Sequence, residues 1–149
     1  MKALLTLIIL TFSINVFSHE TRVLINETRL VGDTCFYNID IKTSCSSPTH
    51  TTDIIAIIIG DADNNEIYAK MDSPYTGGLF KQCTTIPLTL VGSCIGKICK
   101  IYIARVGSDG WMPETITVYN HDDNSPVTFN FNYFIPEAQN SGFNYCHYN

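Results

Sequence analysis

Alternation of apolar and polar side chains is the main pattern of this chain from residue 35 onward. Tyr37, Ile39 and Ile41 are separated by polar residues, which predicts a strand with one buried and one exposed face. The same period of two recurs in residues 127–132, where the apolar positions are expected to point inward.

A different pattern occupies residues 54–59, which are almost wholly aliphatic and β-branched. The run stops at the turn-forming residues 60–65, and so short a run predicts a strand buried on both faces rather than a helix. Residues 67–70 follow across this turn and are expected to pair with the run as a hairpin.

Further short apolar runs follow, separated by turn residues, and no segment has a convincing helical period. These runs cover residues 88–91, 98–106 and 115–119. Regularly spaced short strands of this kind predict an all-β fold, an antiparallel β-sandwich of about eight strands.

Composition narrows the class of protein. The chain has 149 residues, about one domain, with 45% hydrophobic and 15% charged residues, which excludes a disordered tail or a rod. The formal net charge is −5 and there is no basic run. A nucleic-acid partner is therefore excluded, because such binding needs clustered Lys and Arg.

The first residues have the form of a secretory signal peptide. Lys2 precedes an apolar stretch at residues 3–12, and Val16 and Ser18 are small residues at the positions preceding a cleavage site. An uncleaved anchor is the alternative, but the apolar stretch is short for a membrane span. The expected organisation is a signal peptide, an N-terminal leader and one domain at residues 1–18, 19–34 and 35–149.

Six cysteines support export to an oxidising, extracellular location. An even number in a small secreted chain predicts disulfides, and six cysteines allow 15 pairings. They are Cys35, Cys45, Cys83, Cys94, Cys99 and Cys146. A zinc site with the ligands Cys94, Cys99, Cys146 and His147 is the alternative, although a second closely spaced ligand pair is missing.

One sequon for N-linked glycosylation is present, Asn26-Glu27-Thr28. In a secreted protein a glycan at Asn26 would mark a surface segment, and an unused sequon is the alternative reading.

No motif of an enzyme is found in the sequence. The four histidines lie in termini or predicted loops, without a nucleophile in a suitable context, and there is no glycine-rich phosphate loop after a strand. The acidic residues cluster in turns, where backbone conformation alone explains them. We therefore expect a protein that is not an enzyme and needs no cofactor.

Calcium is the one cofactor to consider. Asp61, Asp63 and Asn65 alternate as ligands of a hard cation can, with Asp109 or Asp122 as further candidates. The segment lacks the glycine of an EF-hand loop, and a solvated hairpin turn is the simpler interpretation.

Two aromatic residues are candidates for docking a ligand. Tyr75 lies in a loop beside Gly77 and Gly78, which leave it room to project. Trp111 lies beside Gly110. It is either an exposed docking ring or a buried anchor of the core, and burial is the commoner role of a large aromatic side chain.

An ordered set of motifs resembles the plant embryo-specific protein family. The set consists of Cys35-x9-Cys45, Ile59-Gly60-Asp61, residues 107–114 (GSDGWMPE) and residues 142–146 (GFNYC). This resemblance covers residues 35–146 and implies a PLAT-like β-sandwich, the domain type of lipoxygenases and alpha-toxin.

The resemblance also implies a function. It suggests a secreted, non-catalytic protein with a role in seed or embryo development that docks a lipid, a membrane surface or an extracellular protein partner. A calcium-assisted membrane-docking module is one alternative, and a secreted enzyme or enzyme inhibitor is another. The resemblance assigns no binding residues to this chain.

Overall fold

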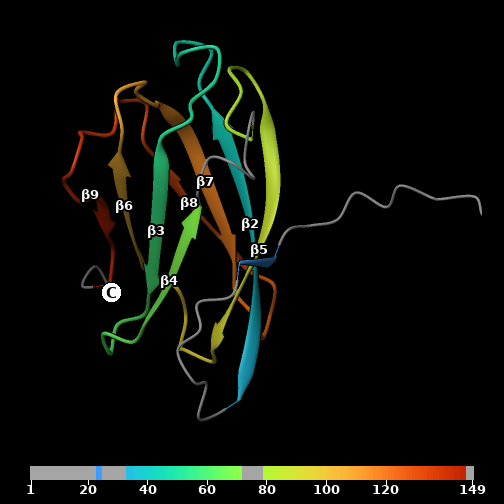
Figure 1. The fold of residues 1–149 in the computed structure, drawn as a ribbon. Helices are drawn as coiled ribbons and strands as arrows, with labels where there is room; N and C mark the ends of the chain where they lie inside the picture. Colours follow the sequence, from blue (N-terminus) through green and yellow to red (C-terminus); the bar gives the residue numbers. More distant parts are fainter. Residues whose placement is uncertain (1–22, 25–32, 72–78, 147–149) are drawn as a thin grey trace, which may run out of the picture.

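The computed structural model describes residues 23–24, 33–71 and 79–146. Nine strands and no helix lie in these ranges, arranged as two packed sheets (Figure 1). The strands are β1 (Val23–Leu24), β2 (Thr34–Thr43), β3 (Ile54–Gly60), β4 (Glu66–Met71), β5 (Thr85–Ser93), β6 (Lys100–Val106), β7 (Pro113–Tyr119), β8 (Pro126–Asn130) and β9 (Ser141–Asn144).

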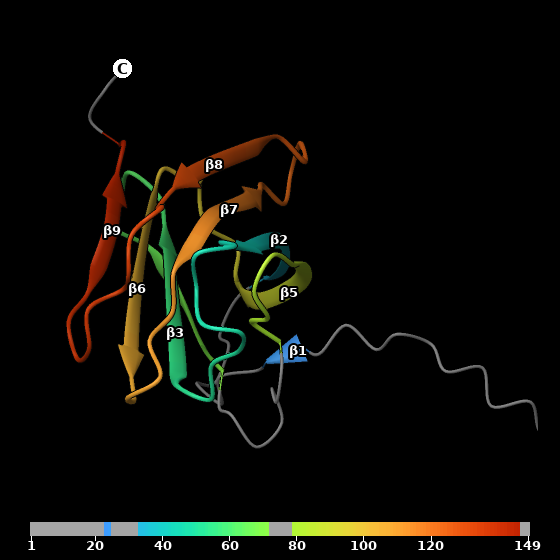
Figure 2. The same ribbon diagram turned by 90° about the horizontal axis from the view of Figure 1, so that it is seen from above.

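The first sheet has the strand order β1-β5-β2-β7-β8 and the second has the order β4-β3-β6-β9. Every pairing is antiparallel except that of the two-residue β1 with β5. Figure 2 shows the two sheets facing each other, with β8 and β9 along one open side. The predicted antiparallel sandwich is therefore confirmed, with β1 as a short addition.

The inward faces of the two sheets form one hydrophobic core. Tyr37, Ile39 and Ile41 of β2 are at most 1% exposed, as their alternation predicts. Phe129 and Phe131 are also buried, although β8 ends at Asn130, before Phe131.

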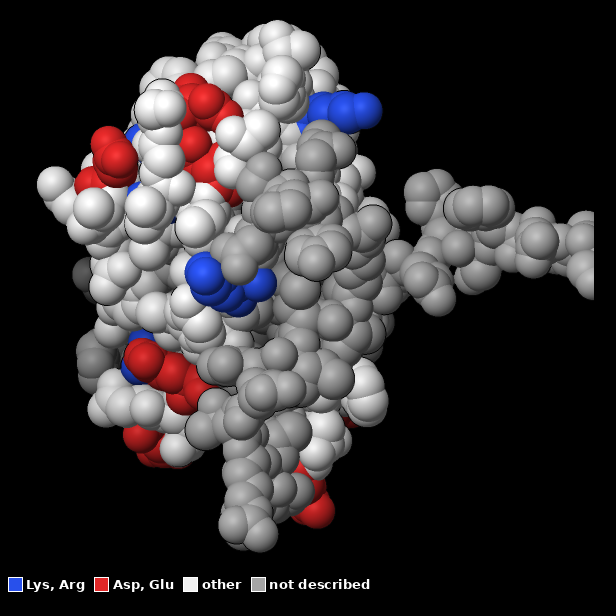
Figure 3. Space-filling view, in the orientation of Figure 1, with Lys and Arg blue, Asp and Glu red and all other residues white. Residues whose placement is uncertain are grey.

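The prediction that β3 is buried on both faces is wrong. Ile55, Ile57 and Ile59 are fully buried in the core. On the other face only the small Ala56 is buried, whereas Ile54 and Ile58 are half-buried. The reason is that the described sandwich has two layers, so nothing in a third layer covers the outer side of β3. Figure 3 shows this side of the molecule with acidic side chains towards its upper and lower ends, a basic group near its middle and mostly uncharged surface elsewhere.

All six cysteines are paired, which confirms the prediction of disulfides. The bonds are Cys35–Cys94, Cys45–Cys83 and Cys99–Cys146. The zinc alternative is wrong, because Cys94 and Cys99 belong to different disulfides, and His147 lies outside the described residues. Three disulfides indicate an oxidising compartment.

The N-terminal residues are described only in part. The expected signal peptide, residues 1–18, and Asn26 lie outside the described residues. Within the expected leader, Val23 and Leu24 pair with Thr89 and Leu90 of β5. In the part of the chain that the structure describes, no helix is long and apolar enough to cross a membrane.

Candidate docking site at one end of the sandwich

Three connections meet at one end of the sandwich, which we call the pinned loop end. They are residues 44–53 between β2 and β3, residues 107–112 between β6 and β7, and residues 131–138 after β8. They meet because β3 begins where its neighbour β6 ends, with Ile54 opposite Val106. This end lies at the top of Figure 1.

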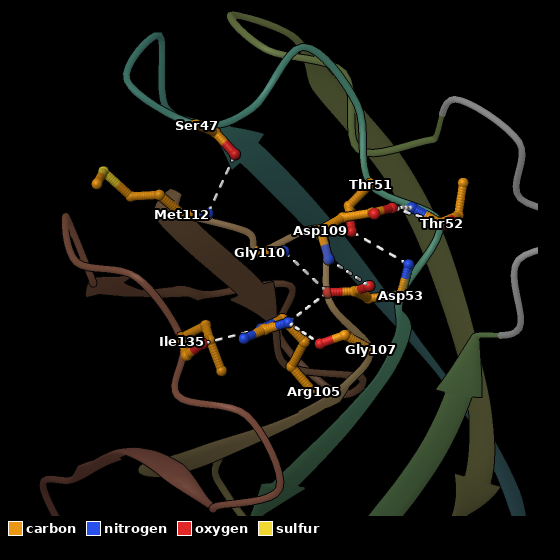
Figure 4. A network of polar contacts seen from close by, with 10 residues as sticks. All are labelled: Ser47, Thr51, Thr52, Asp53, Arg105, Gly107, Asp109, Gly110, Met112 and Ile135. Carbon is orange, nitrogen blue, oxygen red and sulfur yellow. Dashed lines mark hydrogen bonds and ion pairs between the residues drawn. The ribbon is translucent and has the colours of Figure 1, made fainter.

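A buried ion pair joins these connections (Figure 4). Asp53 and Arg105 are 5% and 8% exposed, and Arg105 Nη1 donates to Asp53 Oδ2. The same Nη1 donates to the Gly107 carbonyl at 2.7 Å, and Nε donates to the Ile135 carbonyl at 2.9 Å. Arg105 therefore holds the last connection against the other two.

The Asp53 carboxylate is satisfied on both oxygens. Oδ1 accepts the Asp109 N–H and Oδ2 accepts the Gly110 N–H, each at 3.0 Å, in addition to the Arg105 bond. A buried charge is tolerated only with such compensation, since removing it from water is costly. Asp53 thus fixes the turn at residues 107–110 in one position.

A second carboxylate ties the same turn to residues 51–53. Asp109 Oδ2 accepts the Thr52 hydroxyl at 2.6 Å and the Thr52 N–H at 2.8 Å. These bonds hold the pKa of Asp109 below its ordinary value of 3.8. The Thr52 hydroxyl has the larger effect and the Thr52 N–H the smaller one. Asp109 is exposed, so it acts at the rim of the network rather than within it.

The glycines of this turn are required by its geometry. Gly107 and Gly110 have φ of +142° and +82°, which favour glycine, and a Cβ on Gly107 would collide with the Asp53 carboxylate. The motif GSDG therefore encodes a turn that wraps tightly around a buried aspartate.

Trp111 is buried and anchors the core. Of the two alternatives for this residue, the exposed docking ring is therefore wrong. It is 0% exposed, its ring lies 4.7 Å from that of Phe80, and its Nε1 donates to Thr43 Oγ1 at 3.2 Å. Its carbonyl accepts the Ile135 N–H at 3.0 Å. A ring enclosed in this way cannot contact a partner, and the other candidate, Tyr75, lies outside the described residues.

Among the described residues, Phe134 is an exposed aromatic side chain at the pinned loop end, and sequence reasoning missed it. It is 50% exposed, and a Cβ placed on Gly110 would lie 3.8 Å from its ring and 3.9 Å from Pro48. Its neighbours Tyr133 and Ile135 are half-buried and buried. An exposed ring thus lies beside a turn that the network immobilises.

The opposite end, which we call the Asp61 end, consists of residues 61–65, 94–99 and 120–125. Asp61 is 2% exposed and accepts four hydrogen bonds. Oδ1 accepts the N–H groups of Asp63 and Asn65, and Oδ2 accepts the Gly96 N–H and Asn65 Nδ2, at 2.8–2.9 Å.

These bonds determine the charge state of Asp61. Burial raises its pKa, but the bonds from Asn65, Gly96 and Asp63 together outweigh that effect and lower the pKa below 3.8. The carboxylate is therefore an ionised anchor of the hairpin turn.

This arrangement does not fit the calcium site suggested by Asp61, Asp63 and Asn65. N–H donors occupy both oxygens of Asp61, and the Asn65 side chain presents its amide nitrogen to them. Asp109 lies at the other end of the sandwich, bonded to Thr52. Among the described residues no group of three or more His, Cys, Asp or Glu is placed to hold a metal ion.

The remaining candidate is Asp122, which lies at the Asp61 end in the loop that contains His121. The His121 ring packs edge-on to Tyr37 at 5.3 Å, and its Nε2 lies 3.0 Å from the Ile95 carbonyl. The Tyr37 hydroxyl accepts the Ile95 N–H at 2.9 Å. The pKa of Tyr37 is raised, mainly because the side chain is buried. These contacts close the sandwich beneath the loop.

Comparison with solved structures shows the same fold in larger proteins. A crystal structure of coral 8R-lipoxygenase, an enzyme described as activated by calcium through a C2-like domain, matches with a TM-score of 0.60 and 18% identity, over 72% of this chain and 16% of that one. Alpha toxin from Clostridium absonum matches with a TM-score of 0.58 and 21% identity, over 78% of this chain and 33% of the toxin. At these identities the likeness shows the PLAT-like fold.

Comparison of sequences shows the family. Embryo-specific protein ATS3B of Arabidopsis thaliana is 38% identical over 152 aligned positions, which cover 95% of this chain and 79% of the relative. Embryo-specific protein ATS3A of the same plant is 42% identical, over 75% of this chain and 62% of the relative. The family model for embryo-specific protein 3 matches residues 23–146. This chain therefore belongs to the embryo-specific protein 3 (ATS3) family.

Proposed function

We propose that this chain is a secreted docking module that binds an extracellular partner without transforming it, through the pinned loop end. The observation that carries the proposal is the position of Phe134, half-exposed on connections that Asp53 and Arg105 hold rigidly. A rigid base of this kind lowers the entropy that an exposed aromatic ring loses on binding.

The non-catalytic part of the proposal rests on how the ionisable groups at this end are used. Asp53 and Arg105 neutralise each other and make bonds only to the chain itself. Both side chains are buried, whereas a general acid or base must lie within reach of a substrate.

The partner that we propose is an uncharged apolar patch on an extracellular protein. The chain carries a net charge of −5, and the exposed carboxylates of Asp109 and Glu137 flank this end. An anionic membrane would repel such a surface, because membrane recognition by charge depends on Lys and Arg. The names of the Arabidopsis relatives suggest the embryo as the setting of this interaction.

Binding is tested with two matched variants, Phe134→Ala and Phe36→Ala. Phe36 is 61% exposed on β2 at the opposite end, so both variants remove an exposed ring without disturbing the core. The proteins are immobilised and exposed to extracellular fluid of developing seeds, and separately to vesicles of neutral or of anionic lipid.

We expect a retained protein partner that is lost with Phe134→Ala and kept with Phe36→Ala. Equal retention by both variants would contradict the proposed site. If the protein binds neutral or anionic vesicles and Phe134→Ala abolishes that binding, the partner is a lipid surface and the proposed protein partner is wrong.

Secretion has its own test. N-terminal sequencing of the protein recovered from the medium of a secreting plant cell should begin at or near His19, because cleavage is expected after Ser18. A membrane-bound product that retains Met1 would contradict it.

A further inference from the structure

The side of the sandwich between β8 and β9, which we call the β8/β9 side, carries a row of aromatic rings. β8 and β9 are edge strands of the two sheets, and Figure 2 shows them bordering the same side. Tyr133, Phe143 and Tyr145, which we call the aromatic row, lie with Phe143 in contact with the other two, at centroid distances of 6.5 Å and 5.8 Å. Tyr133 and Phe143 are half-buried and Tyr145 is 41% exposed, so the row lies at the surface.

Two buried rings support the row from inside. Phe129 and Phe131 are 0% and 5% exposed. Tyr145 stacks on Phe129 with centroids 5.3 Å apart and an interplanar angle of 15°, and Phe143 lies edge-on to Phe131 at 5.0 Å. Because one face of the Tyr145 ring rests on a buried ring, the opposite face is the one turned to solvent. The flat face of an aromatic ring is therefore presented at this surface.

The backbone around Tyr145 holds this ring in place. The Tyr145 N–H donates to the Cys99 carbonyl at 2.8 Å, and the next residue, Cys146, is bonded to Cys99. Gly142 allows β9 to approach β6 closely, since a Cβ on it would collide with the Ile101 carbonyl oxygen. The sequence motif GFNYC thus combines a close strand contact, two rings of the row and a covalent anchor. Rings that are fixed in this way lose little entropy on binding.

The sequence around the row is almost uncharged and rich in side-chain amides. Residues 124–146, which include β8, the connection after it and β9, contain one charged residue, Glu137. Exposed asparagines lie on both borders of the row. They are Asn130 and Asn132 on the border formed by β8 and Asn140 and Asn144 on the border formed by β9. An uncharged ligand with many hydrogen-bonding groups fits this combination.

We propose that the aromatic row binds a neutral polysaccharide chain, with sugar rings stacked on the exposed aromatic faces. The C–H groups of a sugar ring carry a weak positive charge, and the face of an aromatic ring is negative. Sugar hydroxyls both donate and accept hydrogen bonds, and so do the side-chain amides of the bordering asparagines. Three rings in a row fit a chain of linked sugars rather than a single sugar.

Hydrogen-bonding chemistry favours a sugar chain over a proline-rich peptide, which also docks on rows of aromatic rings. Proline has no N–H, so such a peptide offers mainly carbonyl acceptors along its backbone. It would use only the donor half of each asparagine amide. A sugar hydroxyl engages the amide oxygen as well as the amide nitrogen.

Charge favours a neutral sugar chain over an acidic one. Glu137, the one charged residue of this stretch, is itself acidic. Lys100 of β6 lies opposite Asn144, but it is 4% exposed and paired with Glu66 at 3.0 Å. The described residues of β8, β9 and the connection between them therefore offer no basic group to pair with the carboxylates of sugar acids.

NMR titration of the unchanged, disulfide-bonded protein tests the site without any substitution. The probes are neutral oligosaccharides of β-linked glucose, mannose, xylose or galactose, with oligogalacturonate as the acidic counterpart and polyproline as the peptide. At least one neutral oligosaccharide should shift the ring resonances of Phe143 and Tyr145 and leave those of Tyr68 on β4 unchanged.

Three results of this titration would overturn the proposal. The first is that none of the four neutral oligosaccharides shifts the row. The second is that oligogalacturonate shifts it as much as the neutral probes do, because the site would then not select an uncharged chain. The third is that polyproline shifts it more than the sugars do, because the ligand is then a peptide.

Matched variants test whether Tyr145 makes the contact. Tyr145→Ala should weaken binding of the oligosaccharide roughly two- to tenfold, the usual effect of losing one aromatic contact. Tyr145→Phe keeps the ring and its stacking on Phe129, so it should bind like the unchanged protein. Tyr68→Ala is the control, because Tyr68 is also 41% exposed but lies on β4. Unchanged binding by Tyr145→Ala, or an equal loss with Tyr68→Ala, would contradict the site.

The sugar site and the proposed docking function fail separately. The docking function depends on Phe134 at the pinned loop end, and Phe134 is not one of the three rings of the row. Phe134→Ala should therefore lose the protein partner and keep the oligosaccharide, whereas Tyr145→Ala should do the reverse.

Discussion

The two ends of the sandwich are each organised by one buried aspartate, with different partners. Asp53 at the pinned loop end is paired with the guanidinium of Arg105, whereas Asp61 at the opposite end is surrounded by N–H groups of its own turn and of Gly96. The disulfides divide in the same way. Cys35–Cys94 and Cys99–Cys146 tie the Asp61 end, and Cys45–Cys83 alone ties the pinned loop end.

The difference shows two ways to immobilise loops. At the Asp61 end, two covalent bonds limit the motion, and the aspartate accepts uncharged N–H donors from its own turn and from Gly96. At the pinned loop end, three connections are distant in sequence, and a charged pair with several bonds holds them together. The end that depends on the ion pair is also the one that presents Phe134.

Matched amide substitutions separate these two arrangements, and the larger effect is expected at Asp53. Asp53→Asn removes the charge that compensates Arg105, and a buried charge left without its partner typically costs about 3–5 kcal/mol. Denaturant unfolding with the disulfides intact measures this loss. A charge-conserving control, Lys42→Arg at the exposed pair with Glu114, should leave the unfolding free energy nearly unchanged.

Asp61→Asn is expected to cost less, about 1–3 kcal/mol, the usual effect of leaving buried donors unsatisfied. No buried cation is left without a partner there, because the four donors to Asp61 are N–H groups. The same unfolding measurement applies. If Asp61→Asn destabilises the protein as much as Asp53→Asn, the charge of Arg105 is not what distinguishes the two ends.

Sequence pattern predicted the architecture but not these partners. Two-residue alternation is a local signal, and it located the strands and the inward side of β2. The pairing of Asp53 with Arg105, 52 residues apart, depends on the register between β3 and β6. One signal was available: Arg105 follows Ile101 and Ile103 at the same period of two, so it occupies an inward position that requires a buried anion.

The exposed position of Phe134 and the open side of β3 were missed for a similar reason. Whether an aromatic residue or an aliphatic strand is covered depends on the number of layers, which the local pattern does not contain. A continuous aliphatic run looks the same in a sheet covered on both faces and in one covered on a single face. Trp111 shows the opposite case, since its size alone favoured burial.

Acid should weaken the contribution of Asp61 in a defined direction. Its pKa in the folded protein lies below the ordinary 3.8, so its stabilising effect is complete above about pH 5 and is lost as the pH falls through the folded value. The difference in unfolding free energy between the unchanged protein and Asp61→Asn should therefore be largest near neutral pH and shrink in acid. A difference that grows in acid would contradict the assignment of Asp61 as an ionised anchor.

The smallest effect is expected at the rim of the pinned loop end, with Thr52→Val. The variant removes the hydroxyl that donates to Asp109 at 2.6 Å and keeps the Thr52 N–H bond, so the pKa of Asp109 should rise towards 3.8. NMR titration of the side-chain carboxyl groups measures this shift, and the melting temperature should hardly change because both groups are exposed.

Asp123 at the Asp61 end is the internal control. Its pKa is lowered by Ser125, first through the side chain and then through the backbone, and it should stay where it is. A shift at Asp123 equal to that at Asp109 would mean that the variant acts on the whole molecule rather than on the contact between Thr52 and its own turn.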